Sequence, residues 1–215
     1  MSAQVTLSMP EVEALSARAA RGVGYSWGHC EECGVASAWL AAHGFDWPSS
    51  LLSRLRGDAG AAIRPAPLKW LSGGPVCALR CGTAIVDFAD LPEGLGAAGL
   101  EVGEVLDPAL LVPFLAQAVR SADRTYDCLV DGVPWLRIQP DGLVFRLAPG
   151  EAAKARASLS LASTDRPSVA PCQPTATITI SRSHYNDLNA LALRMTVPAT
   201  DASARGAGGL GSDND

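Results

Sequence analysis

Three potential metal or redox ligands lie within five residues of the chain, at His29, Cys30 and Cys33. Side chains three or four positions apart share one face of a helix, so these three can converge. Zinc would need one or two further ligands, for which Cys77 and Cys81 are candidates. The C-x₃-C spacing of that second pair and its distance from the first do not fit the usual zinc patterns, so no metal site is favoured.

A thiol-redox pair at Cys30 and Cys33 is the alternative. A position near the start of a helix lowers the pKa of a thiol. However, a helix precedes this motif, whereas a thioredoxin-like motif follows the strand of a βαβ unit. We therefore expect buried, apolar thiols at these positions.

His29 and Glu32 are the weak candidates for catalysis. Their i, i+3 spacing would let the carboxylate orient the imidazole as a general base. Glu31 and Glu32 also lie in the first turns of a predicted helix, where acidic side chains complement the helix dipole. The helix dipole explains both glutamates without any chemistry, and this interpretation is preferred.

The segment Gly24-Tyr25-Ser26-Trp27-Gly28 is the best candidate for a binding site. Glycines on both sides permit a close backbone turn. The helix start that follows presents free N–H groups, which bind carboxylates or phosphates. Tyr25, Trp27 and Gly28 are therefore predicted to contact an anionic ligand. In the alternative interpretation Trp27 packs into the core, and its truncation to Ala would cost about 3–5 kcal/mol.

Two further segments could contribute to anion or cation binding. The cations Arg54, Arg56, Arg64 and Lys69 lie close together in the chain, although such a group is more often a solvated face. The glycine-rich stretch 199–215 ends in Asp213, Asn214 and Asp215, whose oxygens could bind Mg²⁺ or Ca²⁺, or pair with Arg194 and Arg205. Composition alone predicts that this tail is disordered.

Apolar periodicity and capping residues predict helices in both halves of the chain. Ser8 and Glu11 form a capping box, and Pro10 lies in the first turn. Pro113 falls inside the second turn of a later helix, so a distorted start is expected there. The predicted helices are 9–20, 26–42, 51–56 (started by 48–50), 107–119 and 185–195 (capped by Ser183).

Strands are predicted mainly after residue 120. Asp131-Gly132 is a two-residue hairpin signal between two β-like segments. Thr175 to Ile180 has the cleanest period-two pattern in the chain. The predicted strands are 76–79, 84–88 (with a helix as its alternative), 101–106, 126–130, 133–138, 143–147, 155–161 and 175–180. Helices followed by strands predict an α+β class: an N-terminal helical hairpin, a central mixed region and a C-terminal, mainly antiparallel sheet with a final helix.

Length and charge restrict the function further. The chain has 215 residues and a net charge of −5, which fits one α+β domain over residues 1–198 and the tail 199–215. A net negative charge argues against a nucleic-acid partner. Neither a secretory signal nor a membrane span is recognisable, so we expect a cytoplasmic protein without a membrane partner. Arginine supplies 15 of the 17 cations, which together with abundant Ala and Gly suggests a GC-rich bacterial genome.

Two stretches resemble an uncharacterised bacterial family, a domain of unknown function. The first is Arg21-Gly22-Val23-Gly24-Tyr25-Ser26-Trp27-Gly28-His29-Cys30-Glu31-Glu32, and the second runs from Arg194-Met195-Thr196-Val197-Pro198 to Asp213-Asn214-Asp215. The family's pattern does not include Cys30 or Cys33. The resemblance implies that both ends of the chain belong to one design, and it implies no activity.

Three functions are consistent with these features. The first is a cytosolic small-molecule-binding protein or enzyme, with an anionic-ligand pocket near residues 24–32 and the tail. The second is a non-catalytic accessory or interaction subunit. The third is a zinc or thiol-redox module on Cys30 and Cys33. No cofactor is predicted, and the oligomeric state is left open.

Overall fold

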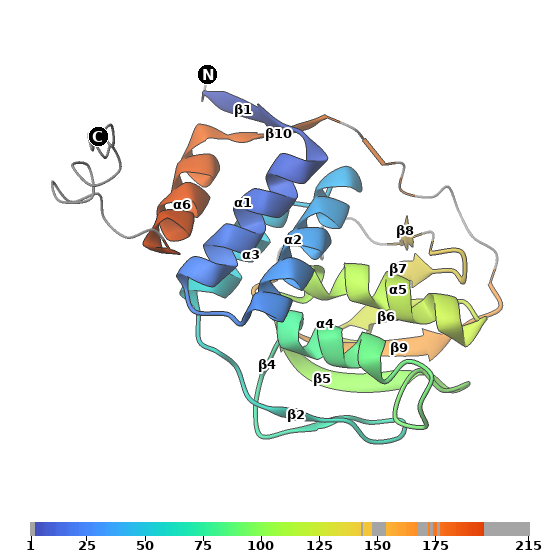
Figure 1. Ribbon diagram of the computed structural model, residues 1–215. Helices are drawn as coiled ribbons and strands as arrows, with labels where there is room; N and C mark the ends of the chain where they lie inside the picture. Colours follow the sequence, from blue (N-terminus) through green and yellow to red (C-terminus); the bar gives the residue numbers. More distant parts are fainter. Residues whose placement is uncertain are drawn as a thin grey trace, which may run out of the picture.

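The computed structural model (Figure 1) describes residues 3–142, 144–147, 154–166, 172, 174–175 and 177–195, and structural statements below refer to these residues. The helices are α1 (Met9–Gly22), α2 (Trp27–Ala42), α3 (Trp47–Arg56), α4 (Ala78–Asp87), α5 (Val112–Ala122) and α6 (Arg182–Ala192), with 3₁₀ turns η1 (Pro108–Leu111) and η3 (Leu193–Met195). The strands are β1 (Gln4–Leu7), β2 (Ile63–Arg64), β3 (Leu71–Ser72), β4 (Val76–Cys77), β5 (Leu100–Leu106), β6 (Tyr126–Val130), β7 (Val133–Ile138), β8 (Val144–Arg146), β9 (Arg156–Ser163) and β10 (Ile178–Ser181).

A six-stranded sheet with the order β4-β5-β9-β6-β7-β8 confirms the predicted α+β class. All neighbouring strands are antiparallel except β4 and β5, which run parallel. The predicted β6–β7 hairpin is present. Its turn residues Asp131 and Gly132 both have positive φ, as a type I′ turn requires.

Helices form two groups around this sheet. Figure 1 shows α4 and α5 lying over one face of the sheet, with α1, α2, α3 and α6 clustered beyond them. The α1–α2 hairpin is as predicted, and α2 also packs on α4 and α5, which connects the two groups. The predicted capping box starts α1, because the Ser8 backbone N–H donates to Glu11 Oε2 at 2.7 Å.

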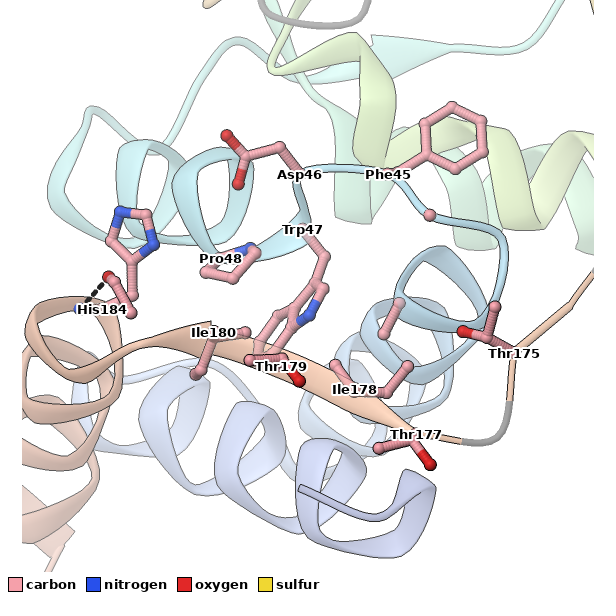
Figure 2. A pocket seen from close by; sticks show the side chains of 13 residues that line it. Phe45, Asp46, Trp47, Pro48, Thr175, Thr177, Ile178, Thr179, Ile180 and His184 are labelled. Atoms are coloured by element: carbon pink, nitrogen blue, oxygen red, sulfur yellow. Dashed lines mark hydrogen bonds between the residues drawn. The ribbon is translucent and has the colours of Figure 1, made fainter. Parts of the chain in front are cut away.

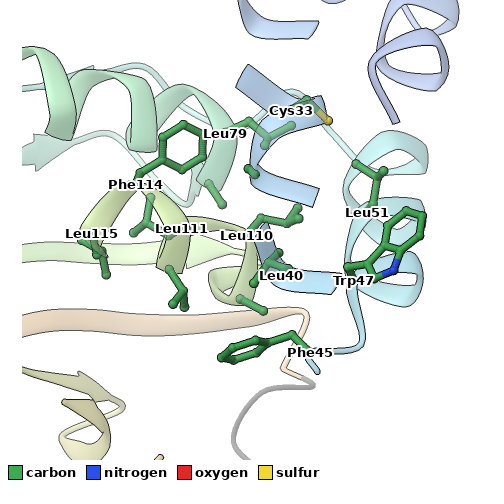
Figure 3. Close-up of a cluster of buried hydrophobic side chains, with 14 of the residues drawn as sticks. Cys33, Leu40, Phe45, Trp47, Leu51, Leu79, Leu110, Leu111, Phe114 and Leu115 are labelled. Atoms are coloured by element: carbon green, nitrogen blue, oxygen red, sulfur yellow. The ribbon is translucent and has the colours of Figure 1, made fainter. Parts of the chain in front are cut away.

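One continuous hydrophobic core joins the helices to the sheet. Figure 3 shows Leu40 of α2 and Leu79 of α4 packed near Leu110 and Leu111 of η1, with Trp47 and Leu51 of α3 nearby. Trp70 is buried, and its indole N–H donates to Glu93 O at 2.7 Å, which anchors the segment before β3.

Several element predictions are wrong in type or boundary. Residues 84–87 belong to α4, so the helix alternative holds and the strand does not. Helix α3 begins at Trp47, one residue before the predicted starting segment, because the Asp46 side chain caps it. Ser181, and not Ser183, caps α6 by accepting from the His184 N–H. The distorted start near Pro113 is confirmed, since η1 precedes α5.

Strand β10 does not join the main sheet. It pairs antiparallel with β1, a strand that the sequence analysis did not predict. Thr175 and Thr177 lie outside β10, and the Thr175 N–H instead donates to Ala42 O at 2.8 Å. The short β1–β10 ribbon joins the two ends of the described chain beside α1 and α6 (Figure 1). In the part of the chain that the structure describes, no helix is long and apolar enough to cross a membrane.

Trp27 is not a core anchor, because 62% of it is exposed. Its ring lies under the Arg21 guanidinium, which is 4.6 Å from the ring centroid. By contrast, Trp135 is 1% exposed and packs edge-on against Phe45.

Exchange of Trp27 for Ala is therefore expected to change the free energy of unfolding by about 1 kcal/mol or less, the size of an exposed cation–π contact. The matched Trp135→Ala variant should lose about 3–5 kcal/mol, because it empties a buried site. Urea unfolding of both variants checks this difference. A Trp27→Ala loss as large as that of Trp135→Ala would contradict the exposed position of Trp27.

Candidate functional site

The parallel strands β4 and β5 end beside one another, and a helix begins after each. Cys77 is the last residue of β4 and pairs in register with Leu106 of β5. Cys77 is also the N-cap residue of α4, and its side chain makes no capping hydrogen bond. Asp107 follows β5 and precedes η1. The carboxyl ends of parallel strands, next to helix starts, are where α/β sheets commonly bind ligands.

Arg54, from the last turn of α3, reaches this edge of the sheet. It is 2% exposed, and its Nη1 lies 3.6 Å from Asp107 Oδ2. Its Nη2 donates to Asp58 O. Its Nε is buried without a hydrogen-bond partner among the described residues. A buried donor without a partner costs free energy, so this N–H is available to an acceptor that enters the site.

Asp107 pairs with Arg54 from a rarely adopted backbone conformation. Its φ is 55°, in the left-handed region, and it is 5% exposed. Burial raises the pKa of the Asp107 carboxyl, while hydrogen bonding by Ser53 and the charge of Arg54 oppose that rise. Such backbone conformations persist where the surroundings impose them, and they concentrate at functional sites.

Tyr25 completes the cluster from the turn between α1 and α2. The predicted close turn exists: Gly24 has a φ of 96°, and the Arg21 Nη1 donates to Tyr25 O at 2.9 Å. This turn brings the Tyr25 hydroxyl to 3.4 Å from Cys77 Sγ. Burial raises the pKa of the Tyr25 phenol well above its usual value, the neighbouring Cys77 adds to the rise, and Arg54 opposes it. The hydroxyl therefore keeps its proton over the physiological range.

We call Tyr25, Arg54, Cys77 and Asp107 the strand-end site. Two features delimit it. On one side the Arg80 guanidinium stands 5.8 Å from the Tyr25 ring centroid. On the other, the chain at Gly60 lies against Cys77, where an added Cβ would come within 2.7 Å of the Cys77 nitrogen. Gly60 also has a φ of 75°, so this close cover needs glycine.

The structure separates most of the other predicted site residues from this cluster. His29 Nδ1 lies 2.7 Å from Ser26 Oγ, so His29 pairs with the N-cap residue of α2. Glu32 lies on another surface, where it lines a cavity between α2 and α5. Among the described residues no hydrogen bond joins His29 to Glu32, so the structure gives no support to this weak catalytic candidate. Gly28 is exposed in the first turn of α2 with open space around it, and Trp27 is exposed beside Arg21.

The cysteines of the predicted metal or redox motif point to main-chain oxygens. Cys30 Sγ donates to Tyr25 O at 3.5 Å, and Cys33 Sγ lies 4.0 Å from Ser16 O. Burial raises the pKa of Cys30, and it raises that of Cys33 to about 12. Burial likewise raises the pKa of Cys81, one helical turn after Cys77. Across the described residues, no group of three or more His, Cys, Asp or Glu side chains is arranged to hold a metal ion.

The C-terminal residues that the sequence predicts for the binding site fall into two groups. Arg194 is exposed in η3, which packs against α1. Arg205, Asp213, Asn214 and Asp215 lie outside the described residues.

A separate cavity of about 520 Å³ lies between the start of α3 and strand β10. Figure 2 shows Trp47 and Pro48 facing β10, with Thr179 on the strand, Thr177 just before it and His184 at one end. The indole N–H of Trp47 is buried without a partner in the described part of the chain. The described residues that line this cavity include no lysine or arginine, so the cavity offers little to the anionic ligand that the sequence predicts.

Sequence reasoning placed Arg54 among surface cations and did not single out Asp107 as a site residue. The sequence does contain a pattern that indicates the burial of Arg54. The buried residues of α3 include Trp47, Leu51 and Arg54, so the arginine falls within an i, i+4, i+7 apolar stripe. The neighbouring cations Arg56, Arg64 and Lys69 are exposed, as the solvated-face interpretation predicts.

Residues 7–160 match the model of a family described as "Protein of unknown function (DUF3726)". The chain belongs to this family. The matched range contains all four residues of the strand-end site, whereas the C-terminal motif from Arg194 onward lies beyond it. No curated protein and no solved structure matches the chain.

Exchange of Arg54 for Met is expected to reduce the free energy of unfolding by about 3–5 kcal/mol near pH 7, because it leaves a buried carboxylate unpaired. The loss should shrink in mild acid. Burial already raises the pKa of Asp107, and removal of the guanidinium raises it further. The folded variant then holds a proton that its unfolded state gives up, so it gains stability relative to the wild type as the pH falls through that pKa.

Urea unfolding at pH 5 and pH 7 measures this difference. Arg56→Met is the control, because Arg56 lies two residues further along the same helix and forms an exposed ion pair with Asp187. Its free energy of unfolding should change little at either pH. Arg54→Met combined with Asp107→Asn should recover much of the loss at pH 7. A loss that is the same at both pH values would contradict the buried pairing of Arg54 with Asp107.

Proposed function

We propose that this protein binds a small anionic ligand at the strand-end site, as a small-molecule-binding protein or an enzyme. The observation that carries the proposal is the buried Arg54 guanidinium with one unpartnered N–H. A planar guanidinium is well suited to carboxylate and phosphate oxygens. The predicted ligand residue Tyr25 belongs to this site, and Trp27 and Gly28 are no longer included.

Three further features favour an anion. The N-cap side chain of α4 leaves the first-turn amides of that helix uncapped, and a helix start attracts negative charge. Arg80 stands over Tyr25 at the exposed side of the cluster. Arg21 lies beside the same turn through its bond to Tyr25 O. Together these cations exceed the single negative charge of Asp107.

Entry of the ligand requires a movement, because Arg54 and Cys77 are 2% and 1% exposed. The segment from Asp58 to Ala61 is the part that covers Cys77. It is held there by the Arg54 bond to Asp58 O and by the Ala61 N–H, which donates to Pro75 O at 2.7 Å. An anion that takes over the Arg54 donors would release the first of these bonds, which couples binding to opening.

Sulfate is a suitable probe, because its charge does not change over the relevant pH range. At about five times the dissociation constant, binding contributes about 1 kcal/mol and should raise the melting temperature of the wild type by about 2–4 °C. The effect should saturate and should exceed that of chloride at equal ionic strength. Arg56→Met should respond like the wild type.

The Arg54→Met variant separates specific binding from the general stabilisation that sulfate gives most proteins. In this variant only the general stabilisation by sulfate, which does not saturate, should remain. The combined variant Arg54→Met/Asp107→Asn repeats the test in a chain without the stranded carboxylate. An equal sulfate response in the wild type and in both variants would disprove an anion site at Arg54.

A bacterial source and a cytoplasmic location belong to the same proposal. All six cysteines are free, which fits a reducing compartment. The preference for Arg over Lys fits a GC-rich genome. Fractionation of the source cells, with the protein detected by antibody, tests the location.

A further inference from the structure

We infer that Cys77 is the nucleophile of the strand-end site and that its substrates are small carboxylic acids with an electrophilic carbon next to the carboxylate. This inference rests on the proposed anion binding at Arg54. It adds a covalent step, and it names the ligand class.

Cys77 differs from the other buried cysteines in its partners. Its sulfur lies 3.4 Å from the Tyr25 hydroxyl, and its residue is the N-cap of α4. A helix start favours the thiolate, which is the reactive form of cysteine. Cys30 and Cys33 instead face main-chain oxygens, and burial opposes ionisation of Cys33, Cys81 and Cys128.

Tyr25 supplies a donor to the sulfur. The two atoms are within hydrogen-bonding distance, and either can donate when both carry protons. Because the phenol retains its proton, the hydroxyl is the donor once the sulfur has lost its own. A retained proton also lets Tyr25 protonate an oxygen that develops charge beside the sulfur.

The position of Arg54 suggests how the carboxylate of the substrate is held. Cys77 Sγ lies 3.4 Å from the Tyr25 hydroxyl, and the charge of the buried Arg54 guanidinium is near enough to lower the pKa of that hydroxyl, so both groups border Tyr25. A carboxylate held by the spare Nε–H of Arg54 therefore places its neighbouring carbon near the sulfur.

A 2-oxo acid illustrates the balanced reaction. The sulfur attacks the keto carbon, an S–C bond forms, and the π bond of the C=O opens. The keto oxygen takes the Tyr25 proton, and the thiol proton restores the tyrosine, so the product is a hemithioketal. No oxidant, reductant or leaving group is required.

Iodoacetate and iodoacetamide test the inference, because only iodoacetate has a carboxylate next to the reactive carbon. The sulfur displaces iodide from either reagent, iodide leaves with the bonding electron pair, and the thiol proton goes to the buffer. Each rate at Cys77, followed by mass spectrometry of peptides from the folded, full-length protein, is divided by the rate of the same reagent with glutathione. The normalised ratio of iodoacetate to iodoacetamide should be about tenfold at Cys77, equivalent to about 1.4 kcal/mol.

Controls identify the groups responsible. The partly exposed Cys172 is an internal reference and should show no preference for iodoacetate. Arg56→Met should keep the preference and Arg54→Lys should reduce it, because a lysine keeps the charge but loses the planar donor set. Tyr25→Phe should slow both reagents to a similar degree. Saturable protection of Cys77 by pyruvate is expected for a 2-oxo acid site.

The outcomes separate the two proposals. Sulfate stabilisation that depends on Arg54, together with no iodoacetate preference at Cys77, would overturn the nucleophile and leave the anion site standing. A folded protein in which Cys77 is not alkylated by either reagent would do the same. Absence of pyruvate protection would overturn the assigned ligand class. Loss of both the sulfate response and the preference would overturn the proposed function as well.

Discussion

The burial of one arginine is the constraint on which the strand-end site depends. Removal of a guanidinium from water costs several kcal/mol unless charge and hydrogen bonds compensate it. Arg54 obtains this compensation from two separate segments, the Asp107 carboxylate after β5 and the Asp58 carbonyl after α3. The contacts of Arg54 therefore fix the end of α3 against the parallel strand pair. The ion pair with Arg54 also helps to hold Asp107 in its left-handed backbone conformation. Each of these features would be unfavourable alone, and together they are mutually required.

The same pairing limits what the site can bind. Arg54 and Asp107 nearly cancel one another in charge, so a ligand does not meet an isolated cation. The groups left to attract a ligand are directional donors, namely the unpartnered N–H of Arg54 and the amides at the start of α4. Arg80 adds long-range attraction. Directional donors in a water-poor site select for geometry more than for charge alone. The proposed site would therefore take a small anion whose oxygens can meet these donors.

Sequence reasoning succeeded where local chemistry determines the structure and failed where tertiary contacts decide it. The Ser8–Glu11 capping box and the Asp131-Gly132 turn act over three or four residues, and both are present. Residues 84–88 contain β-branched side chains, yet their segment becomes helical because Ile85 and its helix neighbours bury one face against η1 and α5. Strand β1 cannot be recognised from its own four residues, because its pairing partner β10 is far away in the sequence. The sequence analysis placed the anion site at the turn of residues 24–28. Of that segment only Tyr25 lies in the proposed strand-end site, because the other members Arg54, Cys77 and Asp107 come from three other elements.

The cysteines show why spacing is a poor guide to reactivity in this chain. Cys30 and Cys33 form the only C-x-x-C spacing in the sequence. Both lie on the face of α2 that packs inward, where their sulfurs meet carbonyl oxygens, which destabilise a thiolate. Cys77 has only the C-x₃-C spacing with Cys81, and its position follows from the end of a strand and the start of a helix. The fold brings the Tyr25 hydroxyl from the α1–α2 turn to 3.4 Å from the Cys77 sulfur and places the buried Arg54 guanidinium of α3 in the same site. Reactivity of a thiol depends on its environment, so the nucleophile that we propose is a cysteine outside the C-x-x-C pair.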